Sequence, residues 1–180
     1  MDLVKGKTIL IVEDEEGIRM LLEDILSSFN ARVLKACDGQ EGIDMFKDNE
    51  IDVVLSDVQM PRMTGIEMCE EIYRLDASVP VVLITAFGDA ESMLSALRSR
   101  VFEFVSKPFQ EEFVIKTVQN ALEQRLIRQS EERLLLSLQS CLGLGDDVSY
   151  RELNFEDRIK YLDELVTIVT IQLKAHKDNS

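Results

Sequence analysis

The stretch TILIVED occupies residues 8–14 and decides the fold class. Its first five residues are apolar or β-branched without interruption, which is typical of a strand buried on both faces of a parallel sheet. Two carboxylates, Glu13 and Asp14, end the run. Apolar residues then recur at helical spacing between residues 18 and 26. A buried strand, an acidic turn and an amphipathic helix therefore form the first half of a β–α–β unit.

The same alternation continues to about residue 122. Four more strands are expected, at residues 31–36, 51–55, 79–84 and 101–105. Four more helices are expected, at residues 40–47, 66–75, 91–98 and from residue 111 past residue 122. Short connections between alternating strands and helices favour a parallel sheet covered by helices on both faces. We therefore expect residues 1–122 to form a five-stranded α/β domain.

The pattern changes in residues 123–180. The first part of this segment, residues 123–133, is mostly charged, and glycine and aspartate interrupt the chain near residue 145. An apolar stripe between residues 155 and 173 predicts a terminal helix, although the β-branched residues 166–171 could instead form a strand. Only four of eight tested heptad positions are apolar, so a long coiled coil is not established. We expect an α-helical C-terminal extension, made of a helical connector and a small helical output or dimerisation region.

The composition excludes several classes of function. The 34 acidic and 20 basic residues give a net charge of −14, which repels nucleic acid and anionic membranes. The one histidine, His176, excludes most Ser-His-Asp triads and multi-histidine metal sites. No apolar run reaches about 18 residues, and the N-terminus lacks the apolar core of a signal peptide. We expect no binding of nucleic acid or membrane.

Cysteine usage points to the cellular compartment. Cys37, Cys69 and Cys141 are odd in number and far apart, so they form neither a CxxC unit nor a disulfide framework. Cysteines of this kind are typical of a reducing environment. We expect the protein to be cytoplasmic and all three cysteines to be small buried apolar residues.

Polar residues stand where the expected strands end. Glu13 and Asp14 follow the first strand, Asp57 the third, Thr85 the fourth and Lys107 the fifth. The carboxyl ends of parallel strands meet at one edge of the sheet, where α/β proteins bind ligands. Three converging carboxylates need a cation, and oxygen ligands suit Mg²⁺. With a lysine alongside, the set is suited to phosphoryl transfer to a carboxylate, giving an aspartyl phosphate.

Four short segments stand at these strand ends: IVEDE at residues 11–15, SDVQMP at residues 56–61 with Gly65, ITA at residues 84–86 and SKPF at residues 106–109. In this order they resemble the receiver domains of bacterial two-component response regulators. The resemblance covers residues 7 to about 122. It implies a flavodoxin-like sheet with the strand order 2-1-3-4-5.

The resemblance implies a phosphoacceptor and a metal site. Asp57 would accept the phosphoryl group and would also bind Mg²⁺. Asp14 would bind Mg²⁺ directly and Glu13 would act through water. The backbone carbonyl of Gln59 would complete the site.

The resemblance also implies a phosphoryl-binding pair and a conformational switch. Lys107 would pair with a phosphoryl oxygen and precede a cis bond to Pro108. Thr85 would bond the phosphoryl group once it arrives. Phe104 would then rotate inward behind Thr85, so that Thr85 and Phe104 together form the switch.

A sensor histidine kinase or a histidine phosphotransfer protein would be the phosphodonor. We expect a response regulator that signals through changed partner binding or self-association, with a homodimer formed by the helical C-terminal region. One alternative is a Mg²⁺-dependent aspartyl-phosphate phosphatase or phosphotransferase, but haloacid-dehalogenase-type enzymes need a second aspartate where this chain has Gln59. Another is a phosphorelay intermediate or adaptor without an output of its own.

Overall fold

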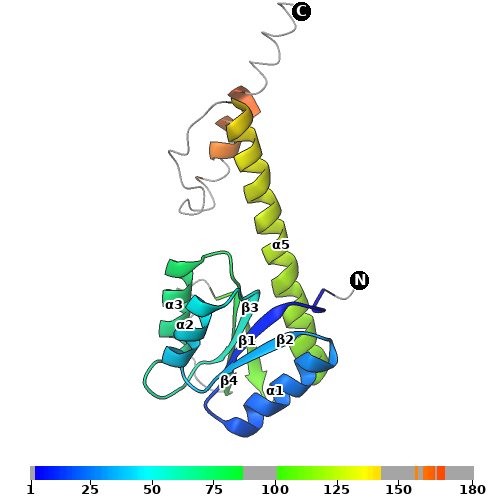
Figure 1. Cartoon of the computed structure of the whole chain (residues 1–180), viewed down its shortest axis with the longest axis vertical. Helices are drawn as coiled ribbons and strands as arrows, with labels where there is room; N and C mark the ends of the chain where they lie inside the picture. The colour runs from blue at the N-terminus through cyan, green and yellow to red at the C-terminus, as the bar shows by residue number, and fades with distance from the viewer. Residues whose placement is uncertain (1–2, 87–100, 143–156, 158–159, 165, 169–180) are drawn as a thin grey trace, which may run out of the picture. The chain divides into compact units, whose positions relative to one another are not determined.

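The computed structural model describes residues 3–86, 101–142, 157, 160–164 and 166–168. These residues contain a parallel sheet flanked by helices (Figure 1). The sheet has five strands in the order β2-β1-β3-β4-β5. Its strands are β1 (Thr8–Val12), β2 (Arg32–Ala36), β3 (Val53–Asp57), β4 (Val81–Ala86) and β5 (Glu103–Lys107). The helices around it are α1 (Glu16–Ser28), α2 (Gly39–Asp48), α3 (Gly65–Leu75) and α5 (Glu111–Leu142). The expected fold class is confirmed, while the helix expected at residues 91–98 lies outside the described residues.

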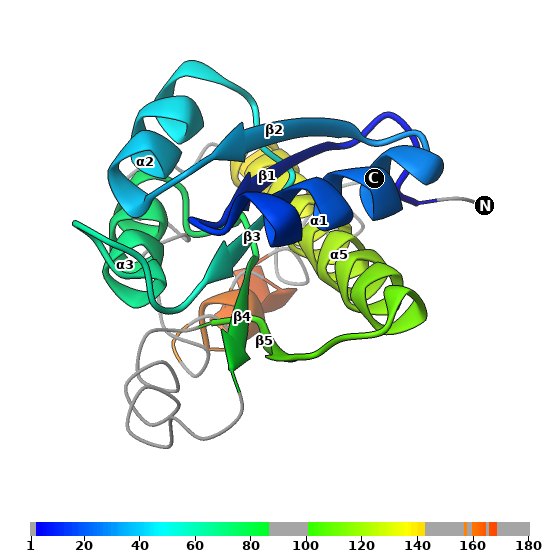
Figure 2. The ribbon, with the colours of Figure 1, turned by 90° about the horizontal axis from the view of Figure 1, so that it is seen from below.

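Helices cover both faces of the sheet, α1 and α5 on one side and α2 and α3 on the other (Figure 2). The alternation of side chains along β1 supplies both cores. Ile9 and Ile11 pack with the apolar residues of α1 and α5, and Leu10 and Val12 pack with those of α2 and α3. Because all five residues of β1 are buried, the uninterrupted apolar run in the sequence has a direct structural cause.

Three strands begin about two residues later than the sequence predicts. Ile51 and Val79 are buried apolar residues, but they lie before β3 and β4 and pack into the core from the connecting segments. Apolar content alone does not distinguish a strand residue from a buried loop residue. The shift makes Asp57 the last residue of β3 and Lys107 the last residue of β5, and it places Thr85 inside β4.

The chain divides into two compact units, Met1–Leu126 and Ile127–Ser180. The sequence places the boundary after residue 122, within α5. In the second unit, the described residues 157, 160–164 and 166–168 are helical. The strand considered for residues 166–171 is therefore wrong at residues 166–168, and the rest of that segment lies outside the described residues.

Arg125 attaches α5 to the amino ends of the central strands. Its guanidinium donates a hydrogen bond to the carbonyl of Ile51 and lies 3.8 Å from the carboxylate of Asp52. Asp52 also accepts a hydrogen bond of 2.9 Å from the backbone N–H of Thr8 and forms an ion pair of 3.3 Å with Lys7. The side chain of Arg125 is only 13% exposed. This contact holds the last turn of α5 that belongs to the first unit.

Candidate functional site

The loop between β1 and α1 brings two carboxylates to the edge of the sheet. Glu13 is fully buried, and its backbone N–H donates a hydrogen bond of 3.1 Å to the carbonyl of Ala36 on β2. Asp14 is exposed. Because β1 ends at Val12 and α1 begins at Glu16, the two carboxylates stand between a buried strand and a helix N-terminus.

The loop after β3 closes tightly around Asp57. The carboxylate of Asp57 accepts a hydrogen bond of 3.0 Å from the backbone N–H of Gln59. The N–H of Gly65 donates a hydrogen bond of 3.0 Å to the carbonyl of Val58, and a Cβ atom at Gly65 would overlap the carbonyl oxygen of Asp57. Thr64 starts α3 with a capping box that includes Glu67. Glycine at position 65 therefore lets α3 begin directly behind the carboxylate.

Lys107 forms ion pairs with a carboxylate of the β1–α1 loop and with one at the end of β3. Its ammonium lies 2.8 Å from the carboxylate of Glu13 and forms a second ion pair with Asp57. The peptide bond between Lys107 and Pro108 is cis. Carboxylate oxygens of Glu13, Asp14 and Asp57 all lie within 4.8 Å of one another. The structure thus brings together three carboxylates and one lysine that are up to 94 residues apart in sequence.

Burial and charge set the protonation of this cluster. Burial raises the pKa of Glu13 to about 7, the hydrogen bond from Lys107 opposes that rise, and the charge of Asp57 adds to it. Burial lowers the pKa of Lys107, but its hydrogen bonds to Asp57 and Glu13 outweigh this and raise the pKa above its ordinary value. One lysine therefore faces three carboxylates, and without a further cation Glu13 takes up a proton at a much higher pH than an ordinary carboxyl does.

The donor set fits a hard divalent cation. All three side chains offer oxygen, the ligand atom that Mg²⁺ prefers, and none offers nitrogen or sulfur. A second cation beside Lys107 would favour the ionised form of Glu13 and so oppose the effect of burial on its pKa. The residues present are therefore suited to hold Mg²⁺.

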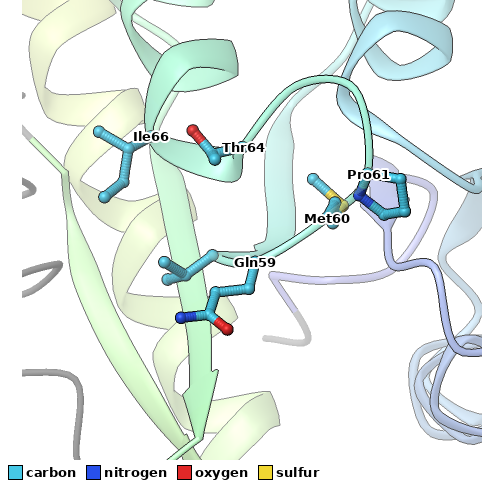
Figure 3. A pocket seen from close by; sticks show the side chains of 6 residues that line it. Gln59, Met60, Pro61, Thr64 and Ile66 are labelled. Atoms are coloured by element: carbon cyan, nitrogen blue, oxygen red, sulfur yellow. The ribbon is translucent and has the colours of Figure 1, made fainter.

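Gln59 and the residues after it line an open pocket of about 480 Å³ next to this cluster (Figure 3). The lining residues come from the β3–α3 loop and the start of α3: Val58, Gln59, Met60, Pro61, Thr64 and Ile66. Gln59 is exposed, whereas Met60 is buried. The pocket is therefore formed by the loop that follows Asp57 in the chain.

Thr85 and Phe104 lie on the neighbouring strands but make no described hydrogen bond to the carboxylates. The hydroxyl of Thr85 donates a hydrogen bond of 3.2 Å to the carbonyl of Ala86, and the residue is 7% exposed. Phe104 is half-buried and packs against the core on the α2 and α3 side. Within the described part of the chain, the structure gathers Glu13, Asp14, Asp57 and Lys107 and leaves Thr85 and Phe104 beside them.

Two residues near the cluster were not foreseen from the sequence. Arg19 of α1 donates hydrogen bonds to the carbonyls of Glu13 and Asp14, and no pattern of residue types marks these partners in the sequence. Cys37 is exposed, so the prediction that all three cysteines are buried is wrong for this one. Cys37 directly follows β2, and the next residue, the buried Asp38, caps α2 with its side chain. Cys69 is buried, and the side chain of Cys141 is outside the described set.

Glu13 predicts a pH dependence for stability. Because its pKa is raised from 4.5 to about 7, the native state of the metal-free protein holds a proton that the unfolded chain releases between these values. We expect the contribution of Glu13 to the free energy of unfolding to be greatest below pH 4.5 and to fall by a few kcal/mol as the pH rises to about 7. Glu13→Gln, which stays neutral, should remove this fall.

Urea denaturation in the presence of a chelator, at pH values below and above this range, measures the effect. The exposed Glu50 is the control site for the same substitution. Glu50→Gln should retain the fall in stability that Glu13 causes in wild type. If wild type and Glu13→Gln lose stability in parallel, the proton is not on Glu13.

Comparisons with known proteins agree on one family. The family model described as "Response regulator receiver domain" matches residues 9–119. The chemotaxis protein CheY of Thermotoga maritima is 32% identical over 114 residues, which cover 63% of this chain and 95% of that protein. The regulatory protein AtoC of Escherichia coli is 33% identical over 137 residues, which cover 76% of this chain but only 30% of AtoC. The chain also spans 42% of the ycf27 protein of Guillardia theta.

Solved structures show the same likeness. A receiver domain protein from Clostridium thermocellum superposes with a TM-score of 0.64 at 28% identity, covering 67% of this chain and 98% of that one. NtrX from Brucella abortus superposes with a TM-score of 0.68 at 29% identity, covering 72% of this chain and 29% of that one.

In the described part of this chain, no helix has the length and hydropathy needed to cross a membrane. The matching segments, the 2-1-3-4-5 sheet and the acidic cluster at its edge identify this chain as a member of the receiver domain family of two-component response regulators.

Proposed function

We propose that Asp57 accepts a phosphoryl group from the phosphohistidine of a sensor histidine kinase or a histidine phosphotransfer protein. The observation that carries this proposal is the position of Lys107, which bonds the carboxylates of both Asp57 and Glu13 at the edge of the sheet. Receiver domains bind Mg²⁺ and typically serve as phosphoacceptor modules rather than as enzymes, and the acidic cluster of this chain is consistent with that role.

In the proposed reaction, a carboxylate oxygen of Asp57 forms a bond to phosphorus as the bond from phosphorus to the histidine nitrogen breaks. The electron pair of that bond leaves with the imidazole. Lys107 stays protonated and moves from the carboxylate towards a phosphoryl oxygen, where its charge offsets the charge that gathers there. A Mg²⁺ ion bound by Asp14, Asp57, the Gln59 carbonyl and, through water, Glu13 would supply the remaining charge neutralisation.

Thr85 and Phe104 are the proposed switch. Thr85 is buried at the carboxyl end of β4, and its hydroxyl bonds only the adjacent carbonyl of Ala86 among the described residues. A rotation about one side-chain bond would release this hydroxyl for a phosphoryl oxygen. Phe104, half-buried on the neighbouring β5, would fill the space that Thr85 leaves.

The C-terminal region is the proposed output. Residues 123–180 would act as a helical connector and a small helical output or dimerisation region, through a homodimer or a changed partner, in the cytoplasm. Leu134 and Leu136 of α5 are both more than half exposed, which leaves apolar surface for such contacts. A phosphorelay intermediate without its own output is the second candidate. His176, which belongs to this region, lies outside the described residues.

Incubation with a small phosphodonor and Mg²⁺ tests the proposed phosphorylation. Intact-mass measurement should show the addition of one phosphoryl group, and a chelator should prevent it. A wild-type mass that does not change would overturn the proposed function. Light scattering with and without a phosphoryl mimic then tests the output: a change in molecular mass supports self-association, and an unchanged mass favours partner recruitment.

A further inference from the structure

The loop that carries Glu13 and Asp14 leads into a helix without an ordinary cap. Glu15 occupies the N-cap position of α1 in an extended conformation, and its side chain makes no capping hydrogen bond. By contrast, Asp38 caps α2 and Thr64 caps α3 with their own side chains. The start of α1 therefore lacks the side-chain cap that α2 and α3 have, and the backbone N–H of Glu15 donates instead to the carboxylate of Glu13 at 3.4 Å.

Arg19, one turn into α1, also bonds this loop. Its guanidinium Nη1 donates a hydrogen bond of 2.5 Å to the carbonyl of Glu13 and one of 3.3 Å to the carbonyl of Asp14. The backbone N–H of Arg19 donates a further bond of 3.0 Å to the carbonyl of Glu15. Among the described residues the guanidinium forms no ion pair with a carboxylate, so its hydrogen-bonding capacity is directed at the loop backbone.

These bonds act on the two residues whose side chains the site needs. Arg19 binds the backbone carbonyls of Glu13 and Asp14, while the carboxylate oxygens of the same two residues lie within 4.8 Å of those of Asp57. Both bonds come from one nitrogen, Nη1, so a single donor ties the two carbonyls together. A charge-assisted hydrogen bond from arginine to a carbonyl is stronger than a neutral one. Arg19 is half-buried, which limits competition from water.

We propose that Arg19 is a positioning residue for the acidic cluster: by binding the carbonyls of Glu13 and Asp14, it holds their carboxylates in place for Mg²⁺. This rests on the proposed function, because it assumes that the cluster binds Mg²⁺. This positioning effect raises the affinity for Mg²⁺, whereas the positive charge of Arg19 by itself lowers it. A nearby positive charge repels Mg²⁺, so charge alone would make Arg19 weaken metal binding.

The two effects predict opposite orders of Mg²⁺ affinity in the full chain. If Arg19 acts by position, affinity falls from wild type to Arg19→Lys, which keeps the charge but ends one bond short of the position of Nη1, and falls further to Arg19→Gln. We expect a loss of about 10-fold to 100-fold for Arg19→Gln, the range found when a partner that orients a metal ligand is removed. If only charge matters, Arg19→Gln binds Mg²⁺ more tightly than wild type and Arg19→Lys is unchanged.

Isothermal titration calorimetry with MgCl₂ measures these affinities, and Arg74→Gln is the matched control. Arg74 is an exposed arginine of α3 that pairs with Glu71, so its loss changes the net charge equally but leaves the loop intact. It should bind Mg²⁺ as wild type does. Unchanged or tighter binding by Arg19→Gln would overturn the proposal.

Amide hydrogen exchange in the presence of a chelator tests the same loop without metal. The amides of residues 14–16 should exchange faster in Arg19→Gln than in wild type, while those of β3 should not change. Equal exchange in the loop would also overturn the proposal. A wild-type protein that binds no Mg²⁺ would instead count against the proposed function, and the exchange measurement would still decide the role of Arg19.

Discussion

Asp57→Asn is expected to abolish phosphoryl uptake. The neutral amide keeps the shape of the side chain and one oxygen for Lys107, but it offers no carboxylate oxygen to attack phosphorus. Intact-mass measurement after incubation with a small phosphodonor and Mg²⁺ should therefore show no addition. Asp48→Asn, at an exposed aspartate of α2, should be phosphorylated like wild type. Full phosphorylation of Asp57→Asn would mean that another residue is the acceptor.

Lys107→Met tests how much Lys107 contributes to the rate of phosphoryl transfer to Asp57. Asp57 stays in place, but the cation that bonds it and Glu13 is lost. Removing one preorganised charge from a phosphoryl-transfer site costs about 100-fold to 1,000-fold in rate. Loss of the hydrogen bond from Lys107 should also raise the pKa of Glu13 above about 7. The rate of phosphoryl uptake measures the first effect, and Lys47→Met, at an exposed lysine of α2, is the control.

Gly65→Ala is expected to cause the largest loss of stability. The added Cβ would overlap the backbone carbonyl of Asp57 and come within 2.8 Å of the hydroxyl oxygen of Ser56. Backbone cannot move aside as a flexible side chain can, so either α3 or the end of β3 must shift. We expect a loss of about 3 kcal/mol or more in the free energy of unfolding, a large fraction of the stability of an ordinary domain. Urea denaturation followed by circular dichroism measures it.

Gly17→Ala is the matched control because it makes the same chemical change in open space. No heavy atom lies within 4 Å of a Cβ built at Gly17, and the residue is in the first turn of α1. Alanine is a better helix former than glycine, so this variant should gain about 0.5–1 kcal/mol. If both variants lost stability equally, the close approach at Gly65 would not be the cause.

The sheet and the site could be predicted from the sequence because buried parallel strands leave an unbroken apolar signal. The runs around Ile9 and Val54 show this signal, and the polar residues that follow such runs are candidates for the ligand-binding edge. The predicted first residues of β3 and β4 were less accurate. Ile51 and Val79 are apolar because they are buried in the connecting segments, and they do not belong to the strands.

Side chains that bond backbone atoms were beyond reach of the sequence. Arg19 contacts carbonyls, which every residue carries, so no pattern of residue types marks its partners. The same holds for Arg125 and the carbonyl of Ile51, which are 74 residues apart. The sequence also did not show that Cys37 is exposed while its neighbour Asp38 is buried and caps α2.

The position of Arg125 bears on how this domain can be exchanged between proteins during evolution. The family match ends at residue 119, yet the arginine that bonds Ile51 and faces Asp52 lies six residues further along α5. A recombination event that joined the receiver to a new partner domain just after the family match would leave that carbonyl and carboxylate without their guanidinium. A crossover beyond Arg125 would keep these contacts within one module, because the compact unit extends to Leu126, past the end of the sequence signature by which the family is recognised.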